Sequence, residues 1–246
     1  MKNTAWFIII FLVSFTLVSV IGIPLPFFLA IFAPLLLVST TYVSLNYNLR
    51  HSLEPATIPK DYESRSYIIN SHHPRLYNLG FQPHDTFYLK MIPDVVVAVF
   101  KHYNEPVYLC IYHFGDKMVV DVISFFENDI SLTTTSNTKG GMFPRPAGKL
   151  LQVFENASYE QLFWEHMQAC QFMQNQGINA ILPLEGFRHR FMEGLRRAGV
   201  KIKEHNLWPL KLLYWSMTKR GREYRTPIEE QYRTGIACMP RKYFSN

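Results

Sequence analysis

The sequence predicts an α+β fold: an N-terminal two-helix transmembrane hairpin, followed by a cytoplasmic domain with an antiparallel β-meander packed against helices. Three observations support this prediction. No charged residue stands between Lys2 and Arg50, runs rich in Val, Ile, Phe, Tyr and Thr fill residues 86–136, and helical patterns dominate the remainder. We expect residues 1–50 to form the hairpin, residues 51–80 a linker with a short helix, and residues 81–246 the α+β domain with basic C-terminal helices.

The hairpin follows from the length of the uncharged segment. Its apolar part, Trp6 to Val43, would extend about 55 Å as one helix, whereas the hydrocarbon core of a bilayer is about 30 Å thick. Pro24 and Pro26 remove backbone donors, and Gly22 permits the chain to reverse. We therefore predict two spans, at about residues 6–21 and 27–43.

The flanking charges predict the orientation of these spans. Lys2 lies on one flank and Arg50 with His51 on the other, so the positive-inside rule places both termini and the soluble domain in the cytoplasm. This describes a multi-pass protein of the cell membrane, integral to the lipid bilayer. A signal anchor with one span and a shallow re-entrant hairpin are the alternatives.

Composition narrows the function classes. Three cysteines without a short spacing indicate neither a disulfide framework nor a zinc site. The segment 186–246 holds fourteen Lys/Arg against five Asp/Glu, a net charge of +9, while the chain before Gly186 has a net charge of −3. A basic C-terminus on an anchored protein favours anionic lipid headgroups. Nucleic acid is not expected as a partner, since no recognition motif is present.

The elements of the domain are predicted in order from periodicity and turn chemistry. After a polar linker at 52–70, a helical turn is expected from Pro74 to Gly80. Short turns such as Gly115-Asp116 make the strands antiparallel neighbours. Several strands are apolar on both faces, so one face is expected to pack on helices and the other to meet a second layer, a partner or a ligand cavity. The predicted strands are Phe87–Met91, Val95–Phe100, Val107–Phe114, Met118–Phe126 and Ile130–Thr135.

The second half is predicted to alternate short strands and helices. Ser158 and Gln161 form a capping box, and Gly177 ends the helix that they begin. The expected elements are a strand at Leu150–Phe154, this helix through Leu162–Gln174, a strand at Ile178–Leu184, and helices at Phe187–Arg197 and Leu207–Lys219.

The loop from Thr133 to Lys149 is the segment most typical of a site. Its glycine pair is able to expose backbone N–H groups to an anion, and its basic residues supply positive charge. It is not a P-loop, because Gly141 and Gly148 are separated by six residues and Leu150 stands where Ser or Thr should bind magnesium. An ordinary irregular loop is the alternative. The candidate anion-binding residues are Thr135, Lys139, Gly140, Gly141, Arg145 and Lys149.

Basic residues near the C-terminus are candidates for contact with the membrane surface, because they accompany aromatic residues on predicted helices. The alternative is a solvated helix face. These candidates are Arg188, Arg190, Arg196, Arg197, Lys219, Arg220 and Arg222.

Histidine and cysteine residues give two weaker candidates. His166 and Cys170, four residues apart on one helix face, suit a metal or a thiolate–imidazole pair. Leu162, Ala169 and Met173 share their stripe, which favours a buried face instead. A second group, His72, His73, His84 and Asp85, lacks any companion metal motif. We expect no bound metal and no cofactor.

These observations favour a non-enzymatic binding or scaffolding domain held at the cytoplasmic membrane surface, with a protein partner or a second copy of the chain as further candidates for binding. The alternative is a membrane-anchored enzyme that acts on an anionic substrate through the loop at 133–149. It ranks second because no nucleophile–base pair is recognisable in the sequence.

Overall fold

The computed structural model describes residues 62–89, 95–114, 117–137, 145–204 and 223–237, with Ala33, Lys211 and Tyr214. The chain divides into two compact units, Met1–Leu45 and Asn46–Asn246, and the fold below is that of the second. The predicted spans at 6–21 and 27–43 lie outside the described residues, Ala33 excepted. Within the described ranges, no helix is long and apolar enough to cross a membrane.

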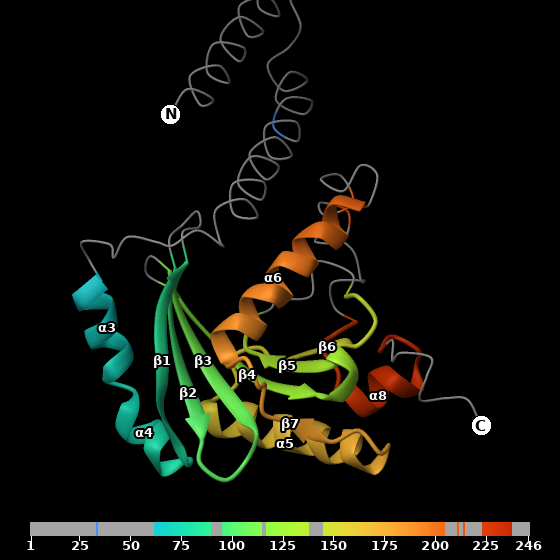
Figure 1. The fold of residues 1–246 in the computed structure, drawn as a ribbon, viewed down its shortest axis with the longest axis horizontal. Helices are drawn as coiled ribbons and strands as arrows, with labels where there is room; N and C mark the ends of the chain where they lie inside the picture. Colours follow the sequence, from blue (N-terminus) through green and yellow to red (C-terminus); the bar gives the residue numbers. More distant parts are fainter. Residues whose placement is uncertain are drawn as a thin grey trace, which may run out of the picture. The chain divides into compact units, whose positions relative to one another are not determined.

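The second unit is built on a mixed sheet of seven strands, an α+β arrangement (Figure 1). The strands are β1 (Phe81–Leu89), β2 (Val95–His102), β3 (Val107–Phe114), β4 (Lys117–Phe126), β5 (Ser131–Thr135), β6 (Lys149–Val153) and β7 (Ala180–Ile181). They follow the order β1-β2-β3-β4-β5-β6, with β7 beside β4. Strands β1 to β5 pair antiparallel in sequence, which confirms the predicted meander.

Strand β6 departs from the meander because it pairs parallel to β5. The local pattern predicted a strand here but not its direction. A parallel neighbour requires a crossover connection of about a dozen residues or more. The segment between Thr135 and Lys149 is long enough for one, unlike the short turns that precede it.

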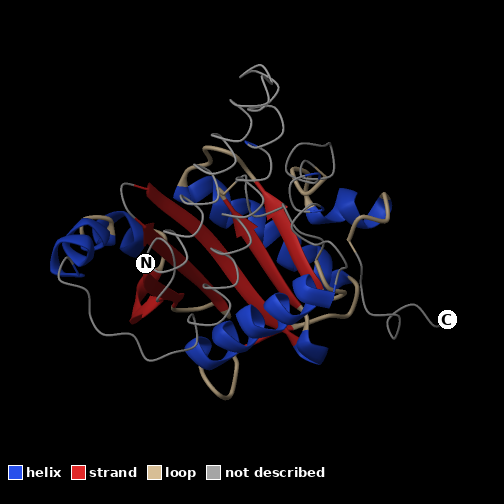
Figure 2. Ribbon diagram, turned by 90° about the horizontal axis from the view of Figure 1, so that it is seen from above, coloured by secondary structure: helices blue, strands red, loops and turns tan. Residues whose placement is uncertain are grey.

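Helices cover both faces of the sheet, as Figures 1 and 2 show. Helices α3, α4, α5 and α8 contribute to the core on one face, and α6 packs on the other. The helices are α3 (Tyr62–Asn70), α4 (His73–Asn78), α5 (Tyr159–Asn175), α6 (Phe187–Glu204) and α8 (Ile228–Arg233), and a 3-10 turn spans Glu127–Asp129.

Strand β2 shows why both faces are buried. Alternate side chains point to opposite faces of a strand. Val96 and Phe100 belong to the core with α4 and α5, whereas Val97 and Val99 belong to the core with α6. Each such side chain contributes about 1.5–3 kcal/mol of hydrophobic stabilisation. The prediction of a sheet with two apolar faces is confirmed.

Helix α5 confirms its predicted boundaries. The Ser158 hydroxyl accepts a hydrogen bond from the Gln161 amide at 3.2 Å, which satisfies one donor of the first turn. Gly177 follows the helix with φ of +77°, a conformation that glycine adopts without strain.

Three helices differ from the sequence-based expectation, and one of them, α8, lies where no helix was predicted. Helix α3 occupies part of the segment 52–70 that was predicted as a linker. It is polar on most sides and has Ile69 as a fully buried contact, so its apolar periodicity is weak. Helix α6 continues to Glu204, past the predicted end at Ala198-Gly199. A glycine within a helix costs about 1 kcal/mol, which did not end this one.

Candidate functional site

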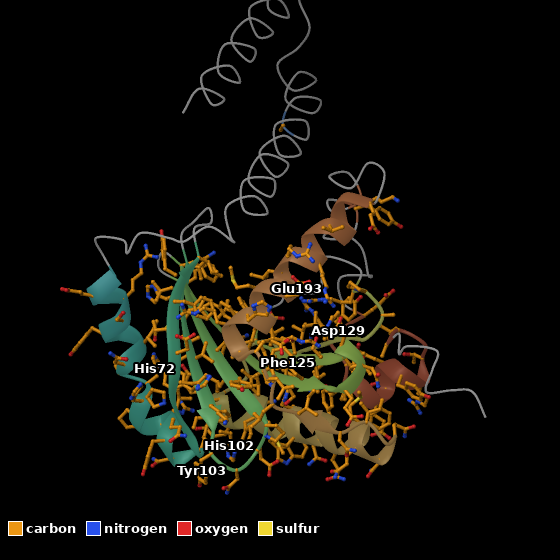
Figure 3. The ribbon with its side chains drawn as sticks, viewed as in Figure 1. His72, His102, Tyr103, Phe125, Asp129 and Glu193 are labelled. Carbon is orange, nitrogen blue, oxygen red and sulfur yellow. The ribbon has the colours of Figure 1, made fainter. Side chains whose placement is uncertain are left out.

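A cavity of about 650 Å³ lies between α6 and the sheet. Its walls come from strands β1 to β6, the segment before β6, and α6. Ile123 and Phe125 line it from the sheet, and Phe191 and Leu195 line it from the helix. Figure 3 shows Phe125 among the strands beneath α6. The volume and the apolar walls are those of a small-molecule site, for which about 300–1,000 Å³ is usual.

The polar groups of the cavity follow from the strand register. Asp121 of β4 pairs with Cys110 of β3 and with Thr135 of β5, so the three form one row across the sheet. Tyr112 lies two residues from Cys110 and therefore on the same face. The sheet thus places one carboxyl, one phenol, one thiol and one hydroxyl together on the face that α6 covers.

Asp121 is the centre of this row. The hydroxyls of Tyr112 and Thr135 and the Arg145 guanidinium lie near its carboxylate and favour the charged form. One carboxylate oxygen, Oδ1, is buried without a hydrogen-bond partner in the described part of the chain. Burial outweighs these favourable contacts and raises the pKa of Asp121 from 3.8 to about 6.

The neighbouring thiol and phenol are neutral at physiological pH. Burial raises the pKa of Cys110 and of Tyr112 well above their ordinary values, and the Asp121 charge adds to both shifts. The thiol is therefore a small buried hydrogen-bonding group. It is not an activated nucleophile, which requires a lowered pKa.

A cationic cluster lies at a second part of the cavity wall. The Asp129 carboxylate receives Lys149 Nζ at 3.0 Å and an Arg190 nitrogen at 2.6 Å, and it also pairs with Arg197. Three cations from β6 and α6 thus converge on one carboxylate. Figure 3 shows Asp129 beside α6, which carries Glu193. Glu193 accepts from Arg197 at 2.8 Å.

The strand register also gives the separation of the two polar groups. Lys149 pairs with Ser131, which pairs with Phe125. The row of Lys149, Ser131 and Phe125 crosses β4 at Phe125, four residues along the strand from Asp121. At about 3.3 Å per residue the two rows are about 13 Å apart. The cavity therefore has a carboxyl region around Asp121 and a cationic region around Lys149, with apolar wall between them.

The structure brings part of the predicted anion-binding loop to this cavity. Thr135 and Arg145 lie at the Asp121 row, and Lys149 lies at the cationic cluster. Lys139, Gly140 and Gly141 lie outside the described residues. The predicted ligand role of these six residues stays a prediction.

The predicted membrane-surface arginines of α6 all form ion pairs within the domain. Arg188 binds Asp85 at 2.5 Å, with its guanidinium 5.0 Å above the Phe87 ring. Arg196 binds Glu193 at 2.8 Å. Arg190 and Arg197 belong to the cationic cluster described above, and Lys219, Arg220 and Arg222 lie outside the described residues. Contact of these residues with a membrane stays a prediction.

His166 and Cys170 lie on the face of α5 that packs against the sheet. His166 Nδ1 lies 2.8 Å from the Thr134 hydroxyl, and Nε2 lies 2.9 Å from the Ser124 hydroxyl. The Gln152 amide donates to Thr134, and Ser124 donates to the Pro106 carbonyl. Each group therefore donates a hydrogen bond to the next, from Gln152 through Thr134, His166 and Ser124 to the Pro106 carbonyl. The His166 proton accordingly lies on Nε2.

These hydrogen bonds occupy both ring nitrogens of His166, and burial lowers the pKa of the imidazole from 6.5 to about 3. Burial also raises the pKa of Cys170 to about 11, so the pair is an uncharged imidazole and an uncharged thiol. Among the described residues no group of three His, Cys, Asp or Glu side chains is arranged to hold a metal ion.

The histidines at the other end of the domain also have structural partners. His72 Nδ1 lies 3.1 Å from the Tyr159 hydroxyl. His102 Nδ1 accepts from the Glu105 amide at 3.0 Å, and its ring stacks on Tyr103. Figure 3 shows His102 and Tyr103 away from α6. These rings fix the β2–β3 turn and the packing of α5.

Sequence reasoning missed Asp121, Asp129 and Glu193. The signal for Asp121 was present: it is the one acidic residue within the apolar run Met118–Phe126. A charge inside such a strand indicates a buried, partnered or functional group. No comparable signal marked Asp129, because its cationic partners come from distant parts of the chain, on β6 and α6.

Comparisons with protein-family models, with curated proteins and with solved structures found no match.

Proposed function

We propose that this protein is a membrane-anchored, non-enzymatic binding domain at the cytoplasmic surface, and that its cavity between α6 and the sheet holds a small amphipathic molecule. One observation carries the proposal: about 650 Å³ of mainly apolar cavity contains a few convergent polar groups. At about 30 Å³ for each water-sized volume, the cavity offers about 20 such volumes, which suits a single short chain with a headgroup.

The buried carboxyl of Asp121 supports a ligand-binding role. A pKa raised from 3.8 to about 6 means that its ionised form destabilises the folded state at neutral pH. A position that serves packing alone is more stable with an uncharged side chain. Groups with such perturbed pKa values cluster at functional sites. The buried carboxylate oxygen Oδ1 has no hydrogen-bond partner among the described residues, which is unusual for a position that serves packing alone.

The proposed membrane anchor is the uncharged N-terminal segment, with two spans and both termini in the cytoplasm. The net charge of +9 over residues 186–246 supports contact with anionic lipid headgroups. A protein partner or a second copy of this chain is compatible with the same location. A topology reporter fused after Asn246 tests the anchor: cytoplasmic fluorescence supports it, and extracytoplasmic phosphatase activity contradicts it.

Gly194 offers a specific test of the cavity. It lies on α6 and lines the cavity, and a Cβ added there meets no atom within 4 Å. Gly194→Leu is therefore expected to fill the cavity while it favours the helix by about 1 kcal/mol. Gln168→Leu on the exposed face of α5 places the same side chain in solvent and is the matched control.

Binding is measured on the full-length chain in a non-ionic detergent by native mass spectrometry with twelve-carbon single-chain amphiphiles. We expect a one-to-one complex with the wild type and with Gln168→Leu, and at least a tenfold loss of affinity with Gly194→Leu. Absence of any complex with every amphiphile, or binding that Gly194→Leu leaves unchanged, contradicts the proposed function.

An enzyme that acts on an anionic substrate is the second candidate, and one observation favours it. Asp121, with a pKa of about 6, shares the cavity with Tyr112 and with the cation Arg145. A carboxyl near neutrality is suited to general acid–base work. If dodecyl phosphate is recovered unchanged after incubation with the wild type, the result favours a binding protein. If the wild type converts it and Asp121→Asn does not, the result favours an enzyme.

A further inference from the structure

We infer that the ligand of the cavity is an amphipathic anion, whose phosphate or carboxylate group is held by Lys149, Arg190 and Arg197 and whose apolar body lies against the sheet. This inference rests on the proposed function and names the class of ligand. A membrane lipid with one chain and a soluble acyl or alkyl phosphate share this chemistry.

The geometry around Asp129 is that of an anion site with an internal occupant. Lys149 of β6 and Arg190 of α6 approach its carboxylate at 3.0 and 2.6 Å, and Arg197, two helical turns beyond Arg190, pairs with it as well. Arginine forks and a lysine ammonium are the side chains that bind phosphate and carboxylate groups. The site therefore already holds carboxylates of the chain itself: Asp129 contacts all three cations, Glu193 pairs with Arg197 at 2.8 Å, and Glu185 lies 3.8 Å from Arg190.

The backbone explains why Asp129 reaches this position. Asn128 and Asp129 have φ values of 56° and 63°, so both adopt the left-handed conformation in the turn between β4 and β5. Such conformations are strained for residues other than glycine and are frequent at ligand sites. The Asp129 side chain is 39% exposed, whereas those of Lys149 and Arg190 are 20% exposed. The Asp129 side chain is thus more exposed than those of Lys149 and Arg190, and in the inferred complex the incoming anion displaces its carboxylate or shares its cationic partners.

The charge of the cavity lining exceeds what Asp129 neutralises. Among the described residues, the cavity lining has five Arg or Lys and three Asp or Glu, a net charge of +2 when Asp121 is ionised. An anionic group at the cationic cluster reduces this surplus, whereas a cationic ligand increases it. The lining therefore favours anions over neutral or cationic molecules of the same shape.

The remaining walls define the rest of the ligand. Ile123, Phe125, Phe191 and Leu195 give an apolar surface next to the cluster, which an inorganic anion leaves uncovered. The Asp121 carboxyl stands about 13 Å from the Lys149 row along the strand. A second anionic group at the far end of the ligand is repelled there, so the class is restricted to amphiphiles with one anionic end.

Matched probes test this inference on the full-length chain in a non-ionic detergent by native mass spectrometry. The probes are dodecyl phosphate, 1-dodecanol, dodecylamine and inorganic phosphate. We expect dodecyl phosphate to bind at least tenfold more tightly than 1-dodecanol, and dodecylamine and inorganic phosphate to bind more weakly than dodecyl phosphate. Lysophosphatidic acid with a twelve-carbon chain distinguishes the lipid source: tighter binding than that of dodecyl phosphate assigns the site to a lipid, and weaker binding assigns it to a soluble phosphate.

Two substitutions of opposite sign test the residues. Lys149→Met keeps an aliphatic stem and removes a cation, so the affinity for dodecyl phosphate is expected to fall about tenfold while that for 1-dodecanol is unchanged. Asp129→Asn removes the internal carboxylate, so the affinity for dodecyl phosphate is expected to rise about tenfold. Arg75→Gln, which removes an exposed cation paired with Glu160 on a different part of the domain, is the control and leaves both affinities unchanged.

Each outcome decides between the inference and the proposed function. Equal affinity for dodecyl phosphate and 1-dodecanol overturns the anionic class but leaves the cavity as a binding site. Tighter binding of dodecylamine than of dodecyl phosphate also overturns the anionic class and leaves the cavity as a binding site. Inorganic phosphate bound as tightly as dodecyl phosphate shows that the ligand needs no apolar body. Absence of binding by every probe overturns the proposed function together with the inference. If Asp129→Asn does not fold, Lys149→Met and the probe series still decide.

Discussion

Replacement of Asp121 by asparagine is expected to stabilise the folded chain at neutral pH. In the unfolded chain this carboxyl loses its proton near pH 3.8, whereas in the folded protein it keeps the proton up to about pH 6. Between these values the folded state binds more protons than the unfolded state. The free energy of unfolding therefore falls as the pH rises from about 4 to about 6, and stays at the lower level above pH 6.

The magnitude follows from the shift of the pKa. A rise from 3.8 to about 6 corresponds to about 3 kcal/mol, since one pKa unit is about 1.4 kcal/mol. Asparagine has no proton to lose, and its carbonyl occupies the same place beside Tyr112 and Thr135. Arg145, however, loses a nearby opposite charge, which reduces the gain. We expect a net stabilisation of about 1–3 kcal/mol at pH 7.5, or a rise in Tm of about 2–4 °C for each kcal/mol.

Thermal unfolding of the full-length chain in detergent, followed by circular dichroism at pH 4 and pH 7.5, measures this effect. Asp121→Asn should unfold at a higher temperature than the wild type at pH 7.5 and at nearly the same temperature at pH 4. Glu155→Gln removes an exposed carboxylate paired with Arg225 and should change the stability by less than about 1 kcal/mol at both values. A variant that is less stable than the wild type at pH 7.5, or a difference that does not depend on pH, refutes the reasoning.

Two further predictions concern the packing of the domain. His166→Gln should lower the free energy of unfolding at pH 7 by about 2 kcal/mol, because two buried hydroxyls lose their partner. Burial holds the pKa of His166 at about 3, against 6.5 in the unfolded chain, so the wild type loses stability in acid. Its advantage over the variant should therefore shrink by about 2 kcal/mol between pH 7 and pH 5, measured by urea titration. Gly80→Ala should destabilise by about 2–3 kcal/mol, because φ is +86° and the new Cβ lies 2.5 Å from His102 Nε2. Gly177→Ala, with φ of +77° and no atom within 4 Å, should lose only about 1 kcal/mol, so equal losses of Tm in the two glycine variants would contradict the role of His102.

The candidate site shows how far residues along the chain predict a cavity. The loop at 133–149 was selected for its glycines and basic residues, and two of its six named residues, Arg145 and Lys149, line the cavity, while Thr135 lies beside Asp121. Their partners were not predicted. Asp121 lies on a strand that reads as apolar, and its pKa depends on burial by elements that no local pattern specifies.

Local sequence signals were sufficient to predict most elements of the described domain. Val, Ile, Phe and Tyr runs with short turns specify antiparallel strands, because a two- to five-residue connection is too short for a parallel crossover. Ser158 and Gly177 specify the ends of α5, because caps act on the backbone groups next to them. These signals operate over a few residues and can therefore be recognised in the sequence.

Which distant groups meet depends instead on how these elements pack. The connection before β6 is long enough to permit either strand direction, and β6 pairs parallel to β5. Helix α6 covers the second apolar face of the sheet because that face must be removed from water. This packing brings Arg190 and Arg197 of α6 to Asp129, in the turn between β4 and β5. The cavity and its charge exist through that packing, since the hydrophobic effect that places α6 is non-directional and leaves no short-range mark in the sequence.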